Sequence, residues 1–243
     1  MSSYPLPNLF IPGVQKAGTT ALASFLSQHP DIYLVDGKEA HVFDDPAYHN
    51  ALDKQRFAEQ KYESKLKHYK GERYILDATP ITMLHPAFIT AASSSCPDAK
   101  YIVMLRNPIE RALSHYAMTK SRGLEPCSPA KAFLLEHHRM KGFYPELPFA
   151  PFESKYRDQS YLIRGRYNKQ LSYLYNVVPR QNVYIEQQKR LSENHDTCLL
   201  RIFNFLGLPN ISVEKKEVFK SSNQYHLPML MRLYLRLLFK VYR

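Results

Sequence analysis

Several features that would assign this sequence to common structural classes are missing from it. No stretch of about 18 consecutive apolar residues occurs, which is the minimum for a membrane-spanning helix. The first residues lack the basic segment and the continuous apolar segment of a secretory signal peptide. No internal repeat and no low-complexity run is present, which excludes solenoids and disordered arrays. We therefore expect a chain with neither a transmembrane span nor a signal peptide.

Cysteine is also scarce. The 243 residues include only Cys96, Cys127 and Cys198, an odd number with no CxxC spacing. This pattern disfavours both a disulfide framework and a zinc site. A reducing compartment fits best, and we predict a cytoplasmic protein.

Positive charge, by contrast, is abundant. Lysine and arginine number 33 against 22 acidic residues, which gives a formal charge of +11. Such a surface attracts polyanions, among them nucleic acid, anionic sugars and nucleotides. The charge by itself does not choose among them.

Short apolar segments alternate with helical patterns along the chain, and several are continuously apolar. This is typical of a parallel sheet covered on both faces. We predict an α/β fold with three layers, a central parallel sheet flanked by helices, in a single domain over residues 1–243 with its core at about 9–209. The predicted strands are Leu9–Val14, Ile32–Leu34, Tyr74–Leu76, Tyr101–Leu105 and Val183–Ile185.

Two helix boundaries have clear local signals. Asn107 and Pro108 are suited to the N-cap and the first helical position, ahead of a helical stretch at Arg111–Lys120. A second helix is predicted at Asp196–Leu206, and it should end at Gly207. The segment 123–158, rich in Pro, aromatic and basic residues, is either an insertion that faces the substrate or a structural flap.

A short loop follows the first predicted strand. It contains Lys16, Ala17 and Gly18, and a helix should open at Thr19 and Thr20. Backbone N–H groups at a helix N-terminus, a lysine and threonine hydroxyls together favour binding of a phosphate group. A Walker A loop places its lysine after the second glycine, whereas Lys16 precedes Gly18.

A second candidate anchor lies between Lys100 and Lys120. Arg106 follows a predicted strand, and Ser114 lies two turns into the capped helix. A guanidinium and a hydroxyl brought to one place would bind a dianionic phosphate.

These two segments, PGVQKAGTTAL and KYIVMLRNPIERALSHY, resemble the 5′-phosphosulfate and 3′-phosphate motifs of the sulfotransferases that use 3′-phosphoadenosine 5′-phosphosulfate (PAPS). The resemblance covers Leu9 to about Pro209 and is greatest for the carbohydrate-modifying, heparan-sulfate-like branch. It implies a sulfotransferase of the EC 2.8.2 class that moves a sulfuryl group from PAPS to a hydroxyl or amine of an acceptor, which the branch suggests is a carbohydrate. It implies a P-loop-like fold and no required metal.

The same resemblance assigns roles to particular residues. Lys16, Ala17, Gly18, Thr19, Thr20, Arg106 and Ser114 would bind PAPS, and Lys220 is a further candidate in a C-terminal basic segment. Glu39 aligns with the catalytic base of the heparan-sulfate-like branch, and Lys16 would stabilise the leaving group. His41 and His115 are alternative bases. Ala78 stands where the family pattern has a lysine, which places the heparan sulfate preference in doubt.

Two other functional classes remain as alternatives. A P-loop nucleotide kinase would need a Walker A loop and a magnesium site, and neither is visible in the sequence. A nucleic-acid-binding protein would use the net charge, but the basic residues are spread over the chain and no binding motif is present. We therefore expect no nucleic acid partner.

The C-terminal segment 227–243 places leucine and methionine among arginine and lysine. It is predicted to form an amphipathic helix that packs on the core with a basic outer face. The alternative is a helix that contacts the membrane surface.

Overall fold

The computed structural model describes residues 5–215 and 225–241. Within these residues five strands form one parallel sheet in the order β2-β3-β1-β4-β5. The parallel sheet confirms the predicted fold class, and every predicted strand is present. The strands are β1 (Leu9–Phe10), β2 (Ile32–Leu34), β3 (Tyr74–Asp77), β4 (Lys100–Leu105) and β5 (Val183–Gln187).

Strand β1 is shorter than the predicted segment Leu9–Val14. The chain still pairs with its neighbours beyond Phe10, since the Ile11 N–H donates to Asp77 O and the Val14 N–H donates to Met104 O, both at 2.9 Å. These bonds hold the start of the loop between β3 and β4. The predicted phosphate loop is therefore anchored at the carboxyl ends of the central strands.

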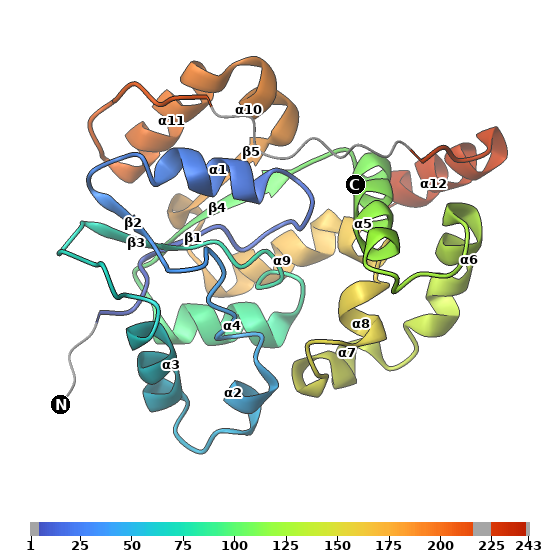
Figure 1. The fold of residues 1–243 in the computed structure, drawn as a ribbon, viewed down its shortest axis with the longest axis horizontal. Coiled ribbons are helices and arrows are strands. Elements are labelled where there is room, and N and C mark those ends of the chain that lie inside the picture. Colours follow the sequence, from blue (N-terminus) through green and yellow to red (C-terminus); the bar gives the residue numbers. More distant parts are fainter. Residues whose placement is uncertain (1–4, 216–224, 242–243) are drawn as a thin grey trace.

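Helices cover both faces of the sheet (Figure 1). Helix α1 lies on one face with α10 and α11, and helices α3, α4 and α9 lie on the other. A further group, α5 to α8 and α12, forms a layer beside the carboxyl ends of the strands. The α-helices are α1 (Thr19–Leu26), α2 (Pro46–Asn50), α3 (Lys54–Glu63), α4 (Pro86–Ser95), α5 (Pro108–Ser121), α6 (Pro129–Arg139), α7 (Phe143–Glu146), α8 (Lys155–Asp158), α9 (Tyr167–Val177), α10 (Gln188–Glu193), α11 (His195–Leu206) and α12 (Met229–Val241); single 3₁₀ turns are η1 (Leu147–Phe149), η2 (Ile163–Gly165) and η3 (Arg180–Asn182).

The two predicted helix boundaries are confirmed. The Asn107 side chain accepts hydrogen bonds from the N–H groups of Ile109 and Glu110, so that α5 begins at Pro108. Helix α11 ends before Gly207, whose φ of 68° lies in the left-handed region that glycine adopts without strain.

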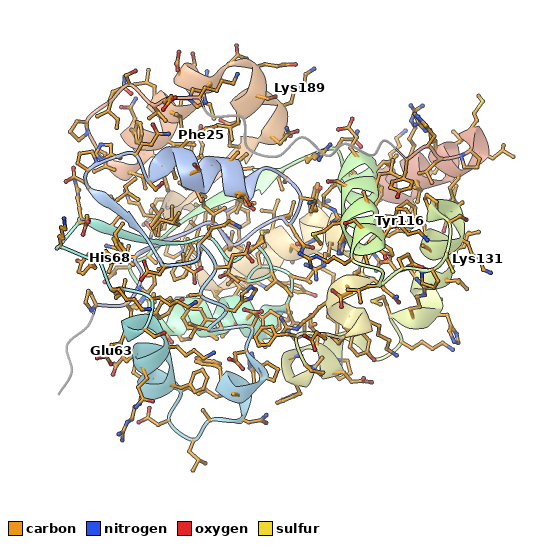
Figure 2. The ribbon with its side chains drawn as sticks, viewed as in Figure 1. Phe25, Glu63, His68, Tyr116, Lys131 and Lys189 are labelled. Atoms are coloured by element: carbon orange, nitrogen blue, oxygen red, sulfur yellow. The ribbon has the colours of Figure 1, made fainter. Side chains whose placement is uncertain are left out.

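The main apolar core lies around the sheet, and a second cluster lies between α5, α6 and α12. Tyr116 of α5 is central to that second cluster (Figure 2). Its ring contacts Phe133 of α6 and Tyr225, which precedes α12, with ring centroids 6.3 Å and 4.9 Å apart. Met231, Leu235 and Phe239 of α12 are buried in the same cluster, so the C-terminal helix packs against α5 and α6.

Cys96, Cys127 and Cys198 all lie in the described part of the chain, and all three are free thiols. Among the helices of residues 5–215 and 225–241, none combines the length and the apolar character that crossing a bilayer requires.

Candidate functional site

The loop between β1 and α1 has the backbone geometry of an anion site. Lys16 and Gly18 have φ values of 70° and 87°, and Gly18 is the N-cap of α1. A methyl group on Gly18 would lie 3.2 Å from the side chain of Gln188, so the loop is tightly enclosed there. In the described structure no side chain caps α1. The first N–H groups of α1 therefore remain available to a ligand.

One expected contact in this loop is taken by the protein itself. The Ala17 N–H donates to Val14 O at 3.1 Å, and Ala17 is fully buried. Its N–H therefore takes part in the turn, and its role as a ligand contact stays a prediction. Thr19 is buried, whereas Thr20 is exposed at the helix start.

Lys16 is the electrostatic centre of the loop. Burial lowers the pKa of its ammonium group, and the charges of neighbouring cations lower that pKa further. Within residues 5–215 and 225–241, no acidic side chain forms an ion pair with Lys16. The contributing cations are Arg122, Arg106, Arg111 and Lys38. Because cations converge there without a matching anion, the site favours a polyanionic ligand.

Arg106 joins the loop to helix α5. Its Nη1 donates to Lys16 O at 3.2 Å, and its Nε lies 3.5 Å from a carboxylate oxygen of Glu110. Tyr167, at the start of α9, donates its hydroxyl to Arg106 O at 2.9 Å. Arg106 is thus held beside the phosphate loop, where the sequence predicts it.

The predicted roles of Ser114 and Lys220 in binding phosphate stay predictions. Ser114 is half-buried on α5, and in the described structure its hydroxyl makes no hydrogen bond, which leaves it free for a ligand. Lys220 lies outside the described residues.

Glu39 lies in a chain of alternating charges. Its carboxylate accepts a hydrogen bond from Lys38 Nζ, and its second oxygen lies 3.1 Å from Nε2 of His41. The Nδ1 of His41 in turn lies 3.0 Å from a carboxylate oxygen of Asp44. These two cations outweigh burial and lower the pKa of Glu39, so its carboxylate is ionised at neutral pH.

Asp44 anchors this chain in the interior. It is fully buried, and Arg157 of α8 donates to its carboxylate at 2.6 Å and also to its backbone oxygen. The ring of Phe152 packs edge-on against His41 at 5.5 Å and beneath the Arg157 guanidinium at 4.6 Å. Part of the 123–158 segment therefore packs on His41 and Asp44, and whether it faces the substrate stays a prediction.

The two alternative bases are poorly placed for that role. His41 has carboxylates at both ring nitrogens, which raises its pKa to about 10 and keeps it protonated at neutral pH. His115 is fully buried, and burial together with Arg164 and Arg111 lowers its pKa well below the usual value. A protonated imidazole cannot take a proton, and a fully buried one cannot reach an acceptor.

The buried carboxylate of Asp77 accepts a hydrogen bond from the N–H of Ala40, the residue after Glu39. Asp77, at the end of β3, accepts hydrogen bonds from the hydroxyls of Tyr62 at 2.8 Å and Thr79 at 2.6 Å. The Ala78 N–H donates to Lys38 O at 3.0 Å, so the two segments run side by side. Lys38, next to Glu39, is therefore adjacent to Ala78 through the backbone, and its ammonium group bonds Glu39.

Sequence reasoning missed several residues of the site. Lys38 directly precedes Glu39, but nothing in the sequence indicated that its ammonium group would bond Glu39 and also lower the pKa of Lys16. Arg111 and Arg122 lie on or directly after α5, and Arg157 comes from a distant segment. The available signal was the predicted helix after Asn107, whose first two turns contain both Arg111 and Ser114.

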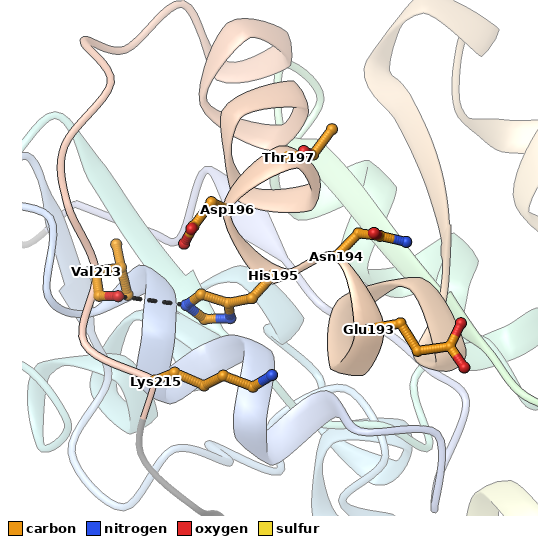
Figure 3. A pocket seen from close by; sticks show the side chains of 7 residues that line it. All are labelled: Glu193, Asn194, His195, Asp196, Thr197, Val213 and Lys215. Atoms are coloured by element: carbon orange, nitrogen blue, oxygen red, sulfur yellow. Dashed lines mark hydrogen bonds between the residues drawn. The ribbon is translucent and has the colours of Figure 1, made fainter.

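Two adjoining cavities of about 340 and 350 Å³ lie elsewhere, at α10 and α11. Asn194 and Thr197 line both. Figure 3 shows His195 in the first cavity, with its Nε2 directed at Val213 O, 3.3 Å away. Neither cavity contains a predicted site residue.

Comparisons with a family model and with curated proteins both identify sulfotransferases as the relatives of this chain. Residues 6–227 match the family described as the sulfotransferase domain. The chain is 31% identical over 226 residues to mouse heparan sulfate glucosamine 3-O-sulfotransferase 3B1 and 29% identical over 222 residues to human heparan sulfate glucosamine 3-O-sulfotransferase 6. These alignments cover 92% and 90% of the chain but 52% and 57% of the relatives, so the chain spans about half their length.

A solved structure is similar over nearly its whole length. The sulfotransferase from Alicyclobacillus acidocaldarius superimposes with a TM-score of 0.77 at 26% identity, over 98% of this chain and 93% of that one.

Proposed function

Because the chain belongs to the sulfotransferase domain family, we propose that it transfers a sulfuryl group from PAPS to a hydroxyl or amine of an acceptor. One observation carries the proposal beyond family membership. Lys16 lies in a loop at a helix N-terminus, among four cations and without an acidic partner in the described structure. A ligand with several phosphate or sulfate charges would balance this group of cations.

The residues present fit such a donor. The loop from Lys16 to Thr20 would bind the 5′-phosphosulfate through the Lys16 ammonium and the N–H groups of α1. Arg106 and Ser114 would bind the 3′-phosphate through a guanidinium and a free hydroxyl. PAPS supplies the activated sulfuryl group when it is bound.

The protein's own contribution to the chemistry is electrostatic. Lys16 stabilises negative charge that develops on the oxygen leaving the sulfur, while Glu39 removes the proton of the attacking acceptor group. His41, held protonated between Glu39 and Asp44, fixes the orientation of the Glu39 carboxylate. Lys38 connects the two parts of the site, because it bonds Glu39 and contributes to the field at Lys16.

We propose a carbohydrate as the acceptor. The names of the relatives that align over most of the chain support this choice, as does the net charge of +11. Phe152, which is exposed beside His41, supplies an aromatic ring of the kind that packs against a sugar.

The test is transfer of labelled sulfate from PAPS to a panel of acceptors, with Lys16→Met beside a matched surface variant, Lys67→Met. Lys67 is an exposed lysine outside the phosphate loop and helix α5. We expect transfer by the wild type and by Lys67→Met, and a loss of orders of magnitude in Lys16→Met. Nucleotide binding provides a second measurement, since adenosine 3′,5′-bisphosphate should raise the melting temperature without magnesium. Stabilisation by ATP with magnesium but not by the bisphosphate would refute the proposal.

A further inference from the structure

Helix α12 exposes apolar side chains that its packing on the protein does not use. Leu230, Leu233 and Leu237 are 82%, 53% and 59% exposed, and Tyr234 between them is 50% exposed. With 3.6 residues per turn, the three leucines recur at i, i+3 and i+7 and lie along one face of the helix. Isolated exposed leucines are ordinary, but a continuous row of them on one helix is not.

A different face of α12 holds the helix to the protein. Met231, Leu235 and Phe239 are buried in the cluster formed with α5 and α6. A methyl group on Gly165 would lie 2.6 Å from the ring of Phe239, so the last turn of α12 is closely seated. The exposed leucines therefore lie on a helix that is already held in place by its opposite, buried face.

A row of cations borders the exposed leucines. Arg232, Arg236 and Lys240 are all exposed and recur at i, i+4 and i+8. The chain from Tyr225 to Val241 contains no Asp or Glu, so no acid on α12 neutralises them. Figure 1 shows α12 at the outer edge of the molecule, beyond α5 and next to α6.

We propose that this face of α12, comprising the exposed leucines, Tyr234 and the three cations, docks on the surface of an anionic lipid bilayer. The helix would lie in the plane of the interface with its leucines among the acyl chain ends. The cations would contact lipid phosphates and carboxylates from long side chains that reach the headgroup layer. The inference does not depend on the reaction that the protein catalyses.

Two other occupants fit the observations less well. A second copy of this chain would bring the cations of two α12 helices together with no acid on either helix to pair with them. A polyanionic sugar would satisfy Arg232, Arg236 and Lys240, but it would leave the row of leucines in water.

The experiment is co-sedimentation of the protein with vesicles of phosphatidylcholine alone or of phosphatidylcholine mixed with phosphatidylserine. Each cation near an anionic leaflet contributes about fivefold to binding, so replacing all three cations with glutamine should weaken binding on the order of 100-fold. Replacing the three leucines with serine should weaken binding at least about tenfold. The loss is limited because the free energy of transfer into the bilayer scales with the apolar area buried, and these leucines are already partly buried in the protein. The matched controls change exposed residues elsewhere on the protein: Leu52→Ser for the leucines, and Arg56→Gln, Lys67→Gln and Lys70→Gln together for the cations.

The proposal is supported if the wild type and both controls bind mixed vesicles more tightly than neutral ones, and if both α12 variants lose this binding. Both variants must also keep the circular dichroism spectrum of the wild type, which shows that they fold. Equal binding of the wild type to both kinds of vesicle would overturn the proposal. Loss in the cation variant alone would also overturn it, since it would indicate a purely electrostatic site for a polyanion. A wild-type dimer in sedimentation equilibrium that becomes monomeric in the leucine variant would identify a second copy as the occupant.

Discussion

Replacement of Glu39 by glutamine separates binding from chemistry at the candidate site. The carboxylate is bonded to Lys38 and to protonated His41, and these cations keep its pKa below the usual value. Glutamine preserves the shape of the side chain and one hydrogen-bond acceptor but cannot take a proton. The defect should therefore appear in the transfer step and not in binding of the donor.

The expected magnitude follows from the role of a positioned base. Loss of such a base costs between about 10² and 10⁴ in rate, or roughly 3 to 5 kcal/mol in the activation barrier. Affinity for adenosine 3′,5′-bisphosphate should stay the same or rise, because the substitution removes a negative charge near the cations around Lys16. The assay compares single-turnover transfer with nucleotide titration, and Glu63→Gln, an exposed acid at the end of α3 (Figure 2), is the control.

The same variant has a second consequence. In the wild type His41 is protonated up to a pKa of about 10 because Glu39 and Asp44 flank it. Without the Glu39 charge, this pKa should fall, and an NMR titration of the His41 ring would measure the fall. A Glu39→Gln enzyme with a single-turnover rate within about fivefold of the wild type would refute the assignment of Glu39 as base.

Four further changes test other parts of the structure. Arg106→Ala should weaken binding of PAPS much more than binding of adenosine 5′-phosphosulfate, which lacks the 3′-phosphate; equal weakening of both would contradict its role. Asp44→Asn should lower the free energy of unfolding by about 3 to 5 kcal/mol in urea titrations, because it leaves buried Arg157 without its counter-charge, and a loss below about 1 kcal/mol would argue against that pairing. The pKa of His41 is raised from 6.5, so its contribution to the free energy of unfolding should be complete below pH 6.5 and disappear as the pH rises through about 10. A free energy of unfolding that increased over this pH range would contradict the raised pKa. Gly165→Ala should cost about 1 to 3 kcal/mol, since its methyl group would meet the buried ring in the last turn of α12, and thermal unfolding measures it against Gly71→Ala, a glycine that has open space but also a positive φ.

Local signals in the sequence determined much of the fold. Short apolar segments predicted all five strands of the described sheet, because strands buried on both faces need apolar side chains throughout. Asn107 and Gly207 marked the start of α5 and the end of α11, since helix caps act over only a few residues. The phosphate loop was equally readable, as its glycine, lysine and threonines are adjacent in the chain.

Long-range contacts were beyond the reach of such signals. The pKa of His41 depends on Asp44, which Arg157 holds in place from a segment 113 residues away. His115 was a reasonable alternative base until the structure placed it in the interior among arginines. The ionisation state of a side chain depends on burial and on neighbouring charges, and both are set by tertiary packing.

The C-terminal helix illustrates the same division. Its sequence determined that it would be amphipathic and basic, because the spacing of leucines and cations already fixes which side chains share a face. The sequence could not determine which of its apolar faces would be used for packing. Only the tertiary structure decided that Met231, Leu235 and Phe239 are buried against α5 and α6 while Leu230, Leu233 and Leu237 remain exposed, since that choice depends on the shape of the surface that receives the helix.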